Sequence, residues 1–148
     1  MYAKPERLPT RIVSLAGDAR DVEIFLGPAR TRGAVTETLG ERLNSHLQFL
    51  PVALGEKVEL LQVDHIVEVE VDGSIQDVEQ LESFGATRAP VTVHLSNGTS
   101  RCGDLVYVAP RETRISDALN STRDQFLLLV VDGRCHYLNR KAVIRVEA

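Results

Sequence analysis

Apolar and polar residues alternate along several short stretches of the chain. Segments 22–26 and 91–95 carry a Val, Ile or Leu at every second position, and segments 67–71 and 144–146 place charged residues between their apolar ones. A period of two with one charged face predicts half-buried antiparallel strands. The apolar residues are expected to point inward, and charged residues such as Glu68 outward.

The two halves of the chain resemble each other. Blocks 21–71 and 90–148 each contain an alternating strand, a turn, a glycine that opens the next strand (Gly33 or Gly103) and an Arg-led polar segment. A shared Gln-Phe-Leu then aligns the blocks at a constant offset of 77, with six identities over the 23 positions 48–70. Each block is expected to hold about five short strands, which favours a small, strongly bent barrel.

Short helices are expected within the blocks and between them. Leu43 and Leu47, and likewise Ile115 and Leu119, are spaced i, i+4, which predicts one helical turn or so in each block. Between the blocks, a Ser followed three residues later by an Asp resembles a capping box, and apolar residues follow at helix-like spacing before Gly85.

The predicted organisation has three parts. Residues 1–73 form a first small β-barrel with an N-terminal extension, residues 74–89 a helical linker, and residues 90–148 a second small β-barrel. In the extension, one possible strand covers residues 11–15.

The second block carries a family resemblance. It contains Val91-Thr92-Val93-His94-Leu95-Ser96-Asn97-Gly98, then Gly103-Asp104-Leu105, then Val143-Ile144-Arg145-Val146. This order of strand, Asn-Gly turn, glycine strand and final strand resembles the Sm-like (LSm, Hfq-like) small β-barrels, including an uncharacterised bacterial group of Sm-like domains. The resemblance implies a mainly all-β fold of two tandem five-stranded barrels. It also implies assembly through strand edges, by which Sm-like units form rings.

The RNA-binding elements of that family are matched only in part. Asn120 follows Asp117 by three residues where the family has four. The element before the last strand is Asn139-Arg140-Lys141 in the second block but Gln62-Val63-Asp64 in the first. RNA binding is therefore expected in the second block if it is present.

Composition and charge narrow the class of protein. The 148 residues are 43% hydrophobic and 26% charged, with a net charge of −4, as in soluble globular proteins. Apolar runs such as 126–131 are too short to span a bilayer, and the N-terminus lacks the apolar core of a signal peptide, so a cytoplasmic location is expected. Segment 56–82 has nine acids and one base, whereas 101–145 has eight bases and five acids, so phosphate would be repelled from the middle of the chain.

No motif for catalysis, a cofactor or a metal is present. The sequence lacks HExxH, GxSxG, Walker A and GxGxxG patterns, so neither an enzyme nor a cofactor is predicted. Cys102 and Cys135 belong to no CxxC pair and are interpreted as reduced thiols on strands, with a disulfide between them left open. A Cys₂His₂ set that adds His94 and His136 is disfavoured.

Six polar residues are the candidates for binding a ligand or partner: Arg114, Ser116, Asp117, Asn120, Arg140 and Lys141. The first four also fit a structural interpretation, in which Ser116 or Asp117 caps a turn and Arg114 pairs with Asp117. Separately, Arg7-Leu8-Pro9-Thr10-Arg11 matches the RxxxR half of the PilZ cyclic-di-GMP motif, whose other half is absent.

The sequence thus predicts a non-catalytic interaction module that assembles with itself or binds a protein partner. The alternatives are an RNA-binding Sm-like protein that uses its basic second barrel and, below it, a PilZ-like cyclic-dinucleotide receptor. A membrane and a small-molecule ligand are disfavoured. The partner, the number of subunits and the redox state of the two cysteines stay open.

Overall fold

The computed structural model describes residues 6–28, 37–71, 76–109 and 113–148. It is mainly β, as predicted. The strands are β1 Glu6–Ser14, β2 Ala19–Leu26, β3 Phe49–Leu54, β4 Lys57–Gln62, β5 Ile66–Val71, β6 Thr87–Leu95, β7 Ser100–Tyr107, β8 Phe126–Val131, β9 Arg134–Asn139 and β10 Val143–Glu147. The helices are α1 Leu39–Leu43, α2 Gln76–Ser83 and α3 Ile115–Ser121, with 3₁₀ turns η1 Val63–His65 and η2 Arg140–Ala142.

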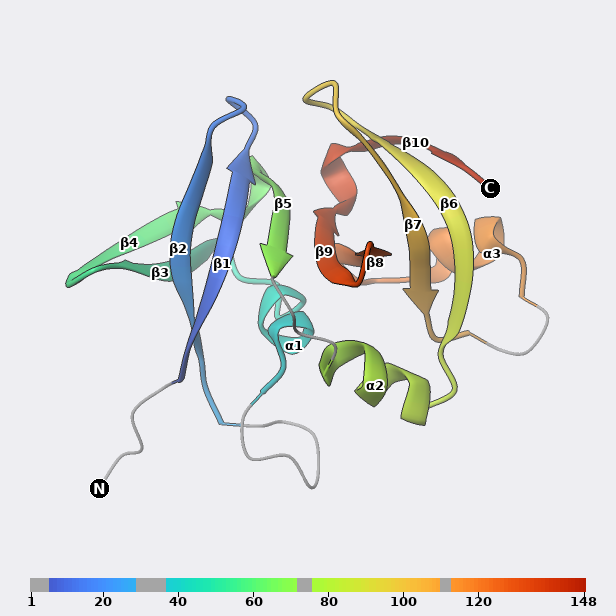
Figure 1. Cartoon of the computed structure of the whole chain (residues 1–148), viewed down its shortest axis with the longest axis horizontal. Helices are drawn as coiled ribbons and strands as arrows, with labels where there is room; N and C mark the ends of the chain where they lie inside the picture. The colour runs from blue at the N-terminus through green and yellow to red at the C-terminus, as the bar shows by residue number, and fades with distance from the viewer. Residues whose placement is uncertain (1–5, 29–36, 72–75, 110–112) are drawn as a thin grey trace.

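All ten strands belong to one antiparallel sheet, with the order β10-β6-β7-β8-β9-β5-β1-β2-β3-β4. Strands β1–β5 form one contiguous part of this order and β6–β10 the other, and β5 and β9 meet in the middle (Figure 1). The two separate five-stranded barrels expected from the sequence are not shown. The described strands form one continuous sheet that is not closed into a barrel.

The internal repeat is confirmed by the strand boundaries. Strands β3, β4 and β5 begin 77 residues before β8, β9 and β10, and η1 lies the same distance before η2. Strands β1 and β2 begin 81 residues before β6 and β7 and have the same lengths as these. Both final strands contain one bulged residue at the same place, Val67 in β5 and Ile144 in β10. We refer to β1–β5 as the first repeat and to β6–β10 as the second.

The start of the first repeat corrects the sequence alignment. The strand at 22–26 had been matched with 91–95, but the structure makes it equivalent to β7, and the equivalent of β6 is β1. The expected N-terminal extension therefore supplies the first strand of the repeat. Gly33 lies outside the described residues. Gly103 does not open a strand but lies within β7, where a Cβ atom would come within 2.3 Å of the Val130 carbonyl oxygen.

The helix expected around Leu43 and Leu47 lies one turn earlier. The Thr38 hydroxyl accepts a hydrogen bond from the Glu41 amide and so caps α1 at its start. The helix ends at Leu43, and His46 adopts a φ of 59°, a left-handed conformation through which an α-helix cannot continue. The equivalent helix in the second repeat, α3, begins at Ile115 as predicted.

The linker contains the expected helix. Helix α2 spans Gln76–Ser83, and Gly85 adopts a φ of 88° just after it, as a glycine that ends a helix commonly does. Ser74, the expected cap, lies outside the described residues. Strand β6 begins at Thr87, inside the range expected for the linker. None of the described helices is long and apolar enough to cross a membrane.

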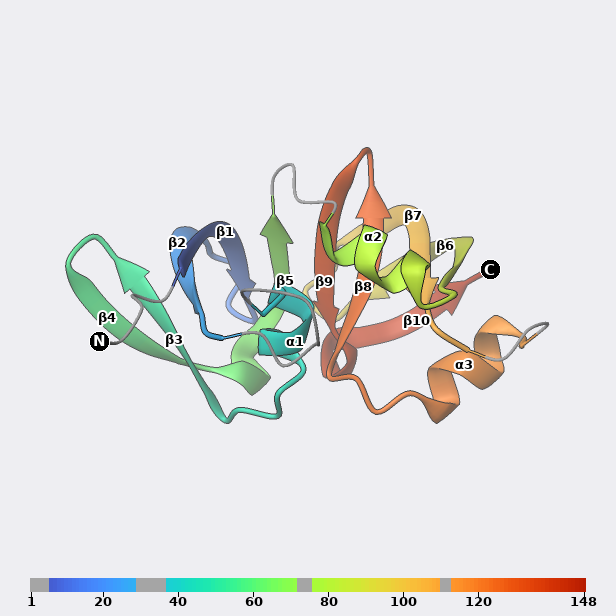
Figure 2. The same ribbon diagram turned by 90° about the horizontal axis from the view of Figure 1, so that it is seen from below.

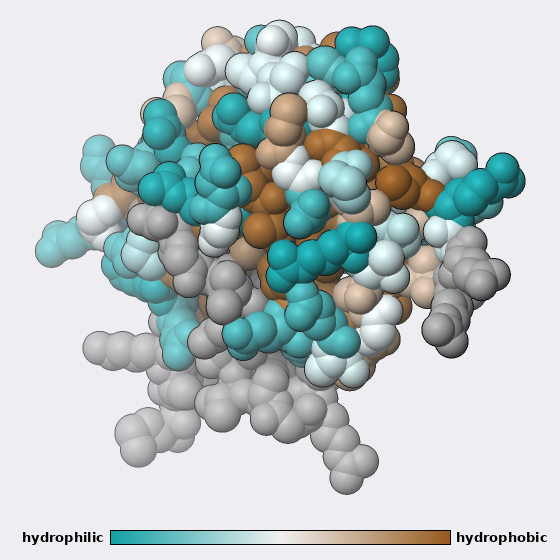
Figure 3. Space-filling model, turned by 45° about the vertical axis from the view of Figure 1, so that its right-hand side comes forward, coloured by the Kyte–Doolittle hydropathy of each residue, from teal (hydrophilic) through white to brown (hydrophobic). Residues whose placement is uncertain are grey.

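Two apolar clusters lie on opposite faces of the strands at the centre of the sheet. Phe126 and Leu128 of β8 belong to the cluster formed with the first repeat, whereas Leu127 and Leu129 belong to the cluster inside the second repeat. Strand β9 alternates in the same way, so these central strands are covered on both faces. Apolar side chains also reach the surface, and Figure 3 shows them gathered in the middle of one face with polar residues around them.

Candidate interaction edges and the junction between the repeats

The two repeats are joined by antiparallel pairing of β5 with β9, which we call the junction. Glu68 pairs with Leu138, Glu70 with His136, and Val71 with Cys135. The junction therefore connects the last strand of the first repeat with the fourth strand of the second.

A buried ion pair lies in this junction. Arg101 of β7 donates from Nε and Nη2 to the two carboxylate oxygens of Glu68, each at 2.9 Å, and His136 Nδ1 donates to Glu68 Oε2 at 3.0 Å. Glu68 is 1% exposed. Burial alone would raise the pKa of its carboxyl, but the hydrogen bonds from His136 and Arg101 outweigh this effect and lower the pKa from 4.5 to about 2.

The prediction that Glu68 faces solvent was therefore wrong. Its side chain alternates with valines as the sequence suggested, but the side chains of Arg101 and His136 cover the face that was expected to be open to solvent. Glu68 stays charged there because Arg101 provides a bidentate cationic partner. The hydrogen bond to Glu68 in turn raises the pKa of Arg101.

Further polar contacts cross the junction. Arg134 Nη1 lies 3.0 Å from Glu70 Oε1, and Lys141 Nζ lies 2.9 Å from Asp64 Oδ1. Asn139 is fully buried, and its side-chain amide donates to two carbonyl oxygens of the first repeat. The acceptors are the carbonyl oxygens of Val63, at 3.1 Å, and Ile66, at 2.8 Å. Hydrogen bonds thus hold the repeats together beyond the strand ladder.

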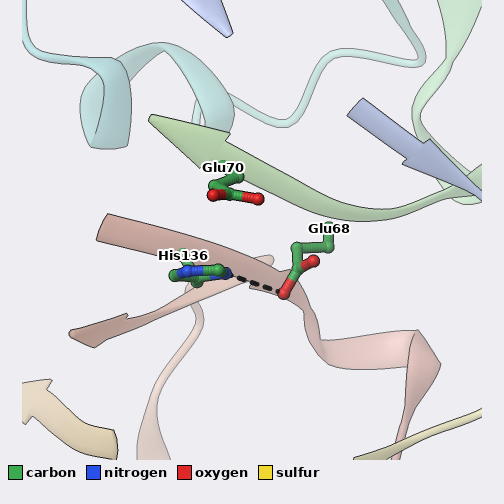
Figure 4. A group of neighbouring side chains, drawn as sticks. All are labelled: Glu68, Glu70 and His136. Carbon is green, nitrogen blue, oxygen red and sulfur yellow. Dashed lines mark hydrogen bonds and ion pairs between the residues drawn. The ribbon is translucent and has the colours of Figure 1, made fainter. Parts of the chain in front are cut away.

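The junction also contains a group of residues that could hold a metal ion. One ligand atom each from Glu68, Glu70 and His136 lies within 4.8 Å of the others (Figure 4). However, both oxygens of Glu68 already accept hydrogen bonds from Arg101, so a bound cation would have to displace a guanidinium group. The arrangement fits a charge-balanced ion-pair network better than a metal centre.

Strands β4 and β10 lie at the two ends of the strand order and are the free edges of the described sheet. In the alignment of the two repeats, β4 corresponds to β9, and β10 corresponds to β5. The two edge strands are therefore the repeat equivalents of the two strands that pair in the junction. Their apolar residues are strongly exposed, with values of 60% for Val58, 64% for Leu60 and 70% for Ile144. Ile144, expected to point inward, is thus exposed because β10 has a neighbour only on its β6 side.

The equivalents of these exposed residues are buried in the junction. Cys135 is equivalent to Val58, Tyr137 to Leu60, and Val67 to Ile144. Cys135 is 1% exposed, Tyr137 2% and Val67 0%. The exposed apolar residues of the free edges therefore occupy positions that the chain itself buries when a second repeat is present.

The charged residues at the edges are also equivalents of junction residues, with some signs exchanged. Glu59 of β4 is equivalent to His136, and Arg20 to Arg101; Arg20 Nη2 lies 2.7 Å from Glu59 Oε2. On β10, Arg145 is equivalent to Glu68, and its Nη1 lies 3.2 Å from Glu147 Oε1. These residues were missed by sequence reasoning, although the exchanged charges at repeat-equivalent positions were a signal that could have found them.

The six residues predicted to bind a ligand fall into two groups. Four of them, Arg114, Ser116, Asp117 and Asn120, are exposed residues at the start of α3 or within it. Arg114 Nε contacts Asp117 Oδ2 at 3.2 Å, as predicted. The expected cap from Ser116 or Asp117 is not found, because the N-cap residue is Arg114 and no side chain caps α3 there. Arg140 and Lys141 form η2 instead. Arg140 Nη1 donates to the Thr122 carbonyl oxygen at 2.6 Å, which places η2 beside the end of α3.

The cysteines and the RxxxR motif also have defined places. Neither Cys102 nor Cys135 forms a disulfide. Cys135 belongs to the cluster shared with the first repeat, whereas the next residue, His136, points to the opposite face toward Glu68, so these two side chains do not converge on one ion. In the RxxxR motif, Arg7 lies over the ring of Phe25, 5.3 Å from its centre.

Comparison with known proteins supplied no relative. No family model, no curated protein and no solved structure matches the chain.

Proposed function

We propose that the protein is a non-catalytic assembly module whose copies associate through the free edges β4 and β10. The observation that carries the proposal is the equivalence between these edges and the buried junction. The free edge of β4 corresponds to the edge of β9 that pairs with β5 in the junction, and the free edge of β10 corresponds to the edge of β5 that pairs with β9. A second copy of the chain thus extends the sheet by the same pairing that already joins the repeats.

The register of the junction predicts the contacts between copies. If β10 pairs with β4 as β5 pairs with β9, Glu147 faces Glu59 and lies beside Lys57, as Glu70 faces His136 and contacts Arg134. Arg145 then takes the place of Glu68 and comes next to Glu59, which also pairs with Arg20, the equivalent of Arg101. Glu59 thus lies between two positive side chains in this contact. Each negative residue at this contact has a positive neighbour, so the edges are complementary in charge although several signs are exchanged.

The apolar residues support the same pairing. Val58 and Leu60 on β4 and Ile144 on β10 are more than half exposed, and exposed apolar strand edges are sites of association. Pairing would bury them as Cys135, Tyr137 and Val67 are buried in the junction. Because the two edges differ, the contact is head to tail and generates a closed ring or an open filament.

Size-exclusion chromatography with light scattering tests the proposal. We expect the wild-type chain to form oligomers and Leu60→Asp to shift it to the monomer. Leu15→Asp is the matched control, because Leu15 is also a large exposed apolar residue but belongs to the turn after β1 and not to either edge strand. A wild-type chain that stays monomeric at the highest attainable concentration contradicts self-assembly.

A charge exchange tests the register. Glu59→Arg places a positive charge beside Arg145 of the next copy and should dissociate the oligomer. Adding Arg145→Glu in the same chain restores opposite charges across the contact and should restore the oligomer. If the double variant remains dissociated as fully as the single one, the inherited register is wrong.

A second candidate function, RNA binding, is favoured by one groove. A groove of about 470 Å³ brings Arg140 and Lys141 together with the half-exposed ring of Phe49, and Asp64, which pairs with Lys141, also lines it. Two bases and an accessible ring suit a phosphate and a stacked base. This candidate predicts RNA affinity that falls steeply with salt and drops when Arg140 and Lys141 are replaced by Ala. Arg123→Ala in the same repeat is the control. Affinity that is insensitive to salt, or to removal of both bases, contradicts it.

A further inference from the structure

A cavity of about 540 Å³ lies between the three α-helices and the middle of the sheet. Its walls come from both repeats and from the linker helix, and Figure 2, seen from below, shows α1, α2 and α3 arranged around β8. This volume is within the range of small-molecule sites, which often lie where two structural units meet. The cavity shares none of its lining residues with the free edges β4 and β10.

Aromatic side chains are concentrated in this cavity. The chain has three Tyr, four Phe and no Trp, and four of these rings line it: Phe84, Tyr107, Phe126 and Tyr137. Phe126 and Tyr137 are each 2% exposed core residues and so present almost no ring surface to a ligand. Phe84, just after α2, is 60% exposed, and Tyr107 is partly exposed. Aromatic faces carry partial negative charge and attract organic cations.

The charge of the lining points the same way. Glu41 of α1 and Asp124, which precedes β8, are the only ionised side chains among the described lining residues, and no Arg, Lys or His is among them. The lining also contains the polar, uncharged side chains of Thr38, Asn44, Gln80, Ser121 and Thr122. Two carboxylates, no positive charge among the described lining residues and the accessible ring of Phe84 disfavour an anion and favour a cation with an apolar body.

We propose that this cavity binds an organic cation, namely an alkylated ammonium group attached to an apolar or aromatic body. The rings of Phe84 and Tyr107 contact the alkylated cation and the apolar body, and the carboxylates of Glu41 and Asp124 balance the charge. This inference is independent of assembly through the strand edges.

Three probes that share one phenyl ring test the charge preference. The full-length protein is titrated with benzyltrimethylammonium, with neutral benzyl alcohol and with anionic benzoate, and binding is followed by calorimetry and by amide chemical shifts. We expect saturable binding of benzyltrimethylammonium with shifts at the cavity residues, weaker binding of benzyl alcohol and the weakest of benzoate. Absence of binding by the cation, or equal binding of all three probes, overturns the proposal.

Variants separate the aromatic and carboxylate contributions. Phe84→Ala should weaken binding of the cation by about threefold, the size expected for one exposed cation–π contact. Glu41→Gln should weaken binding of the cation and leave binding of benzyl alcohol unchanged. The controls are Phe49→Ala, an exposed ring outside the cavity, and Glu79→Gln, an exposed acid of α2 that does not line it. Equal losses in the controls and the cavity variants contradict the assignment of the site.

Discussion

The junction strands β5 and β9 pair with each other, whereas their repeat equivalents, β10 and β4, lie at the two ends of the sheet. Val67 and Ile144 are repeat equivalents at the same bulge, yet one is 0% exposed and the other 70%. Tyr137 and Leu60 differ in the same way, at 2% and 64%. The difference comes from the neighbouring strand, since β5 has a partner on both sides and β10 on one. Ile144 and Leu60 are therefore exposed because β10 and β4 each have only one neighbouring strand in the described sheet.

The charged residues of the junction and of the free edges differ in the sign of their charge. Glu68 in the junction is equivalent to Arg145 at the edge, so the repeats have not kept the sign of the charge. They have kept an ion-pairing residue at this position: Glu68 pairs with Arg101 of another strand, and Arg145 pairs with Glu147 of its own strand. In the junction pair Glu68 is buried and Arg101 is partly exposed, whereas Arg20 and Glu59 are both well exposed. The two pairs should thus differ greatly in energy.

The largest expected effect is on stability after removal of one cation. Arg101→Met leaves the buried carboxylate of Glu68 without its bidentate partner, and the free energy of unfolding should fall by about 3–5 kcal/mol. Arg20→Met, the equivalent change in the first repeat, removes an exposed pair and should lower it by less than about 1 kcal/mol. Urea unfolding of both variants measures the difference. Similar losses would show that the ion pair of Arg101 is no more important for stability than the exposed ion pair of its equivalent, Arg20.

The second prediction concerns how the stability contributed by Glu68 depends on pH. The folded-state pKa of Glu68 lies at about 2, below its ordinary 4.5, so its ionised form stabilises the fold above pH 4.5. This contribution is lost as the pH falls from 4.5 toward 2, because the carboxylate becomes protonated. The stability difference between wild type and Glu68→Gln should therefore shrink over that window. Glu59→Gln, at the exposed pair, is the control, and the same shrinkage there would contradict the assignment to Glu68.

Much of the fold could be predicted from the alternation and the repeat. The offset of 77 that aligns Gln48-Phe49-Leu50 with Gln125-Phe126-Leu127 also relates the boundaries of β3 and β4 to those of β8 and β9. Strand β1 was only partly anticipated because its pattern is weak. Pro9 interrupts it, and the core position at Thr10 is polar, with a hydroxyl that donates to the Val22 carbonyl oxygen.

The junction could not be predicted because it depends on residues distant in sequence. Glu68 alternates with valines as a solvent-facing residue would, and nothing near it in the chain indicates burial. Its partners, Arg101 and His136, follow 33 and 68 residues later and reach it only after β9 pairs with β5. Local patterns predict strands, but they do not say which strands become neighbours.

A third prediction compares two amides at equivalent positions. Asn139 is fully buried and bonds to two carbonyl oxygens of the first repeat, whereas its equivalent Gln62 is exposed at the β4 edge. Asn139→Ala leaves those carbonyl groups unsatisfied and should destabilise the protein by about 2–3 kcal/mol. Gln62→Ala should change stability by about 0.5 kcal/mol or less. Thermal unfolding measures both, and an equal shift would mean that the amide of Asn139 contributes nothing special.

The smallest expected effect sharpens the comparison at the bulge. Val67→Ala removes two methyl groups from a fully packed site and should cost about 2 kcal/mol. Ile144→Ala should change the unfolding free energy by about 0.5 kcal/mol or less in dilute, monomeric protein. At concentrations where copies pair through their edges, the same change should weaken association, because Ile144 then takes the buried place that Val67 has in the junction. Sedimentation equilibrium of Ile144→Ala measures that loss, with Leu15→Ala as the control for an exposed apolar residue outside β4 and β10. Unchanged association would mean that the bulge of β10 is not buried between copies, even if other edge residues are.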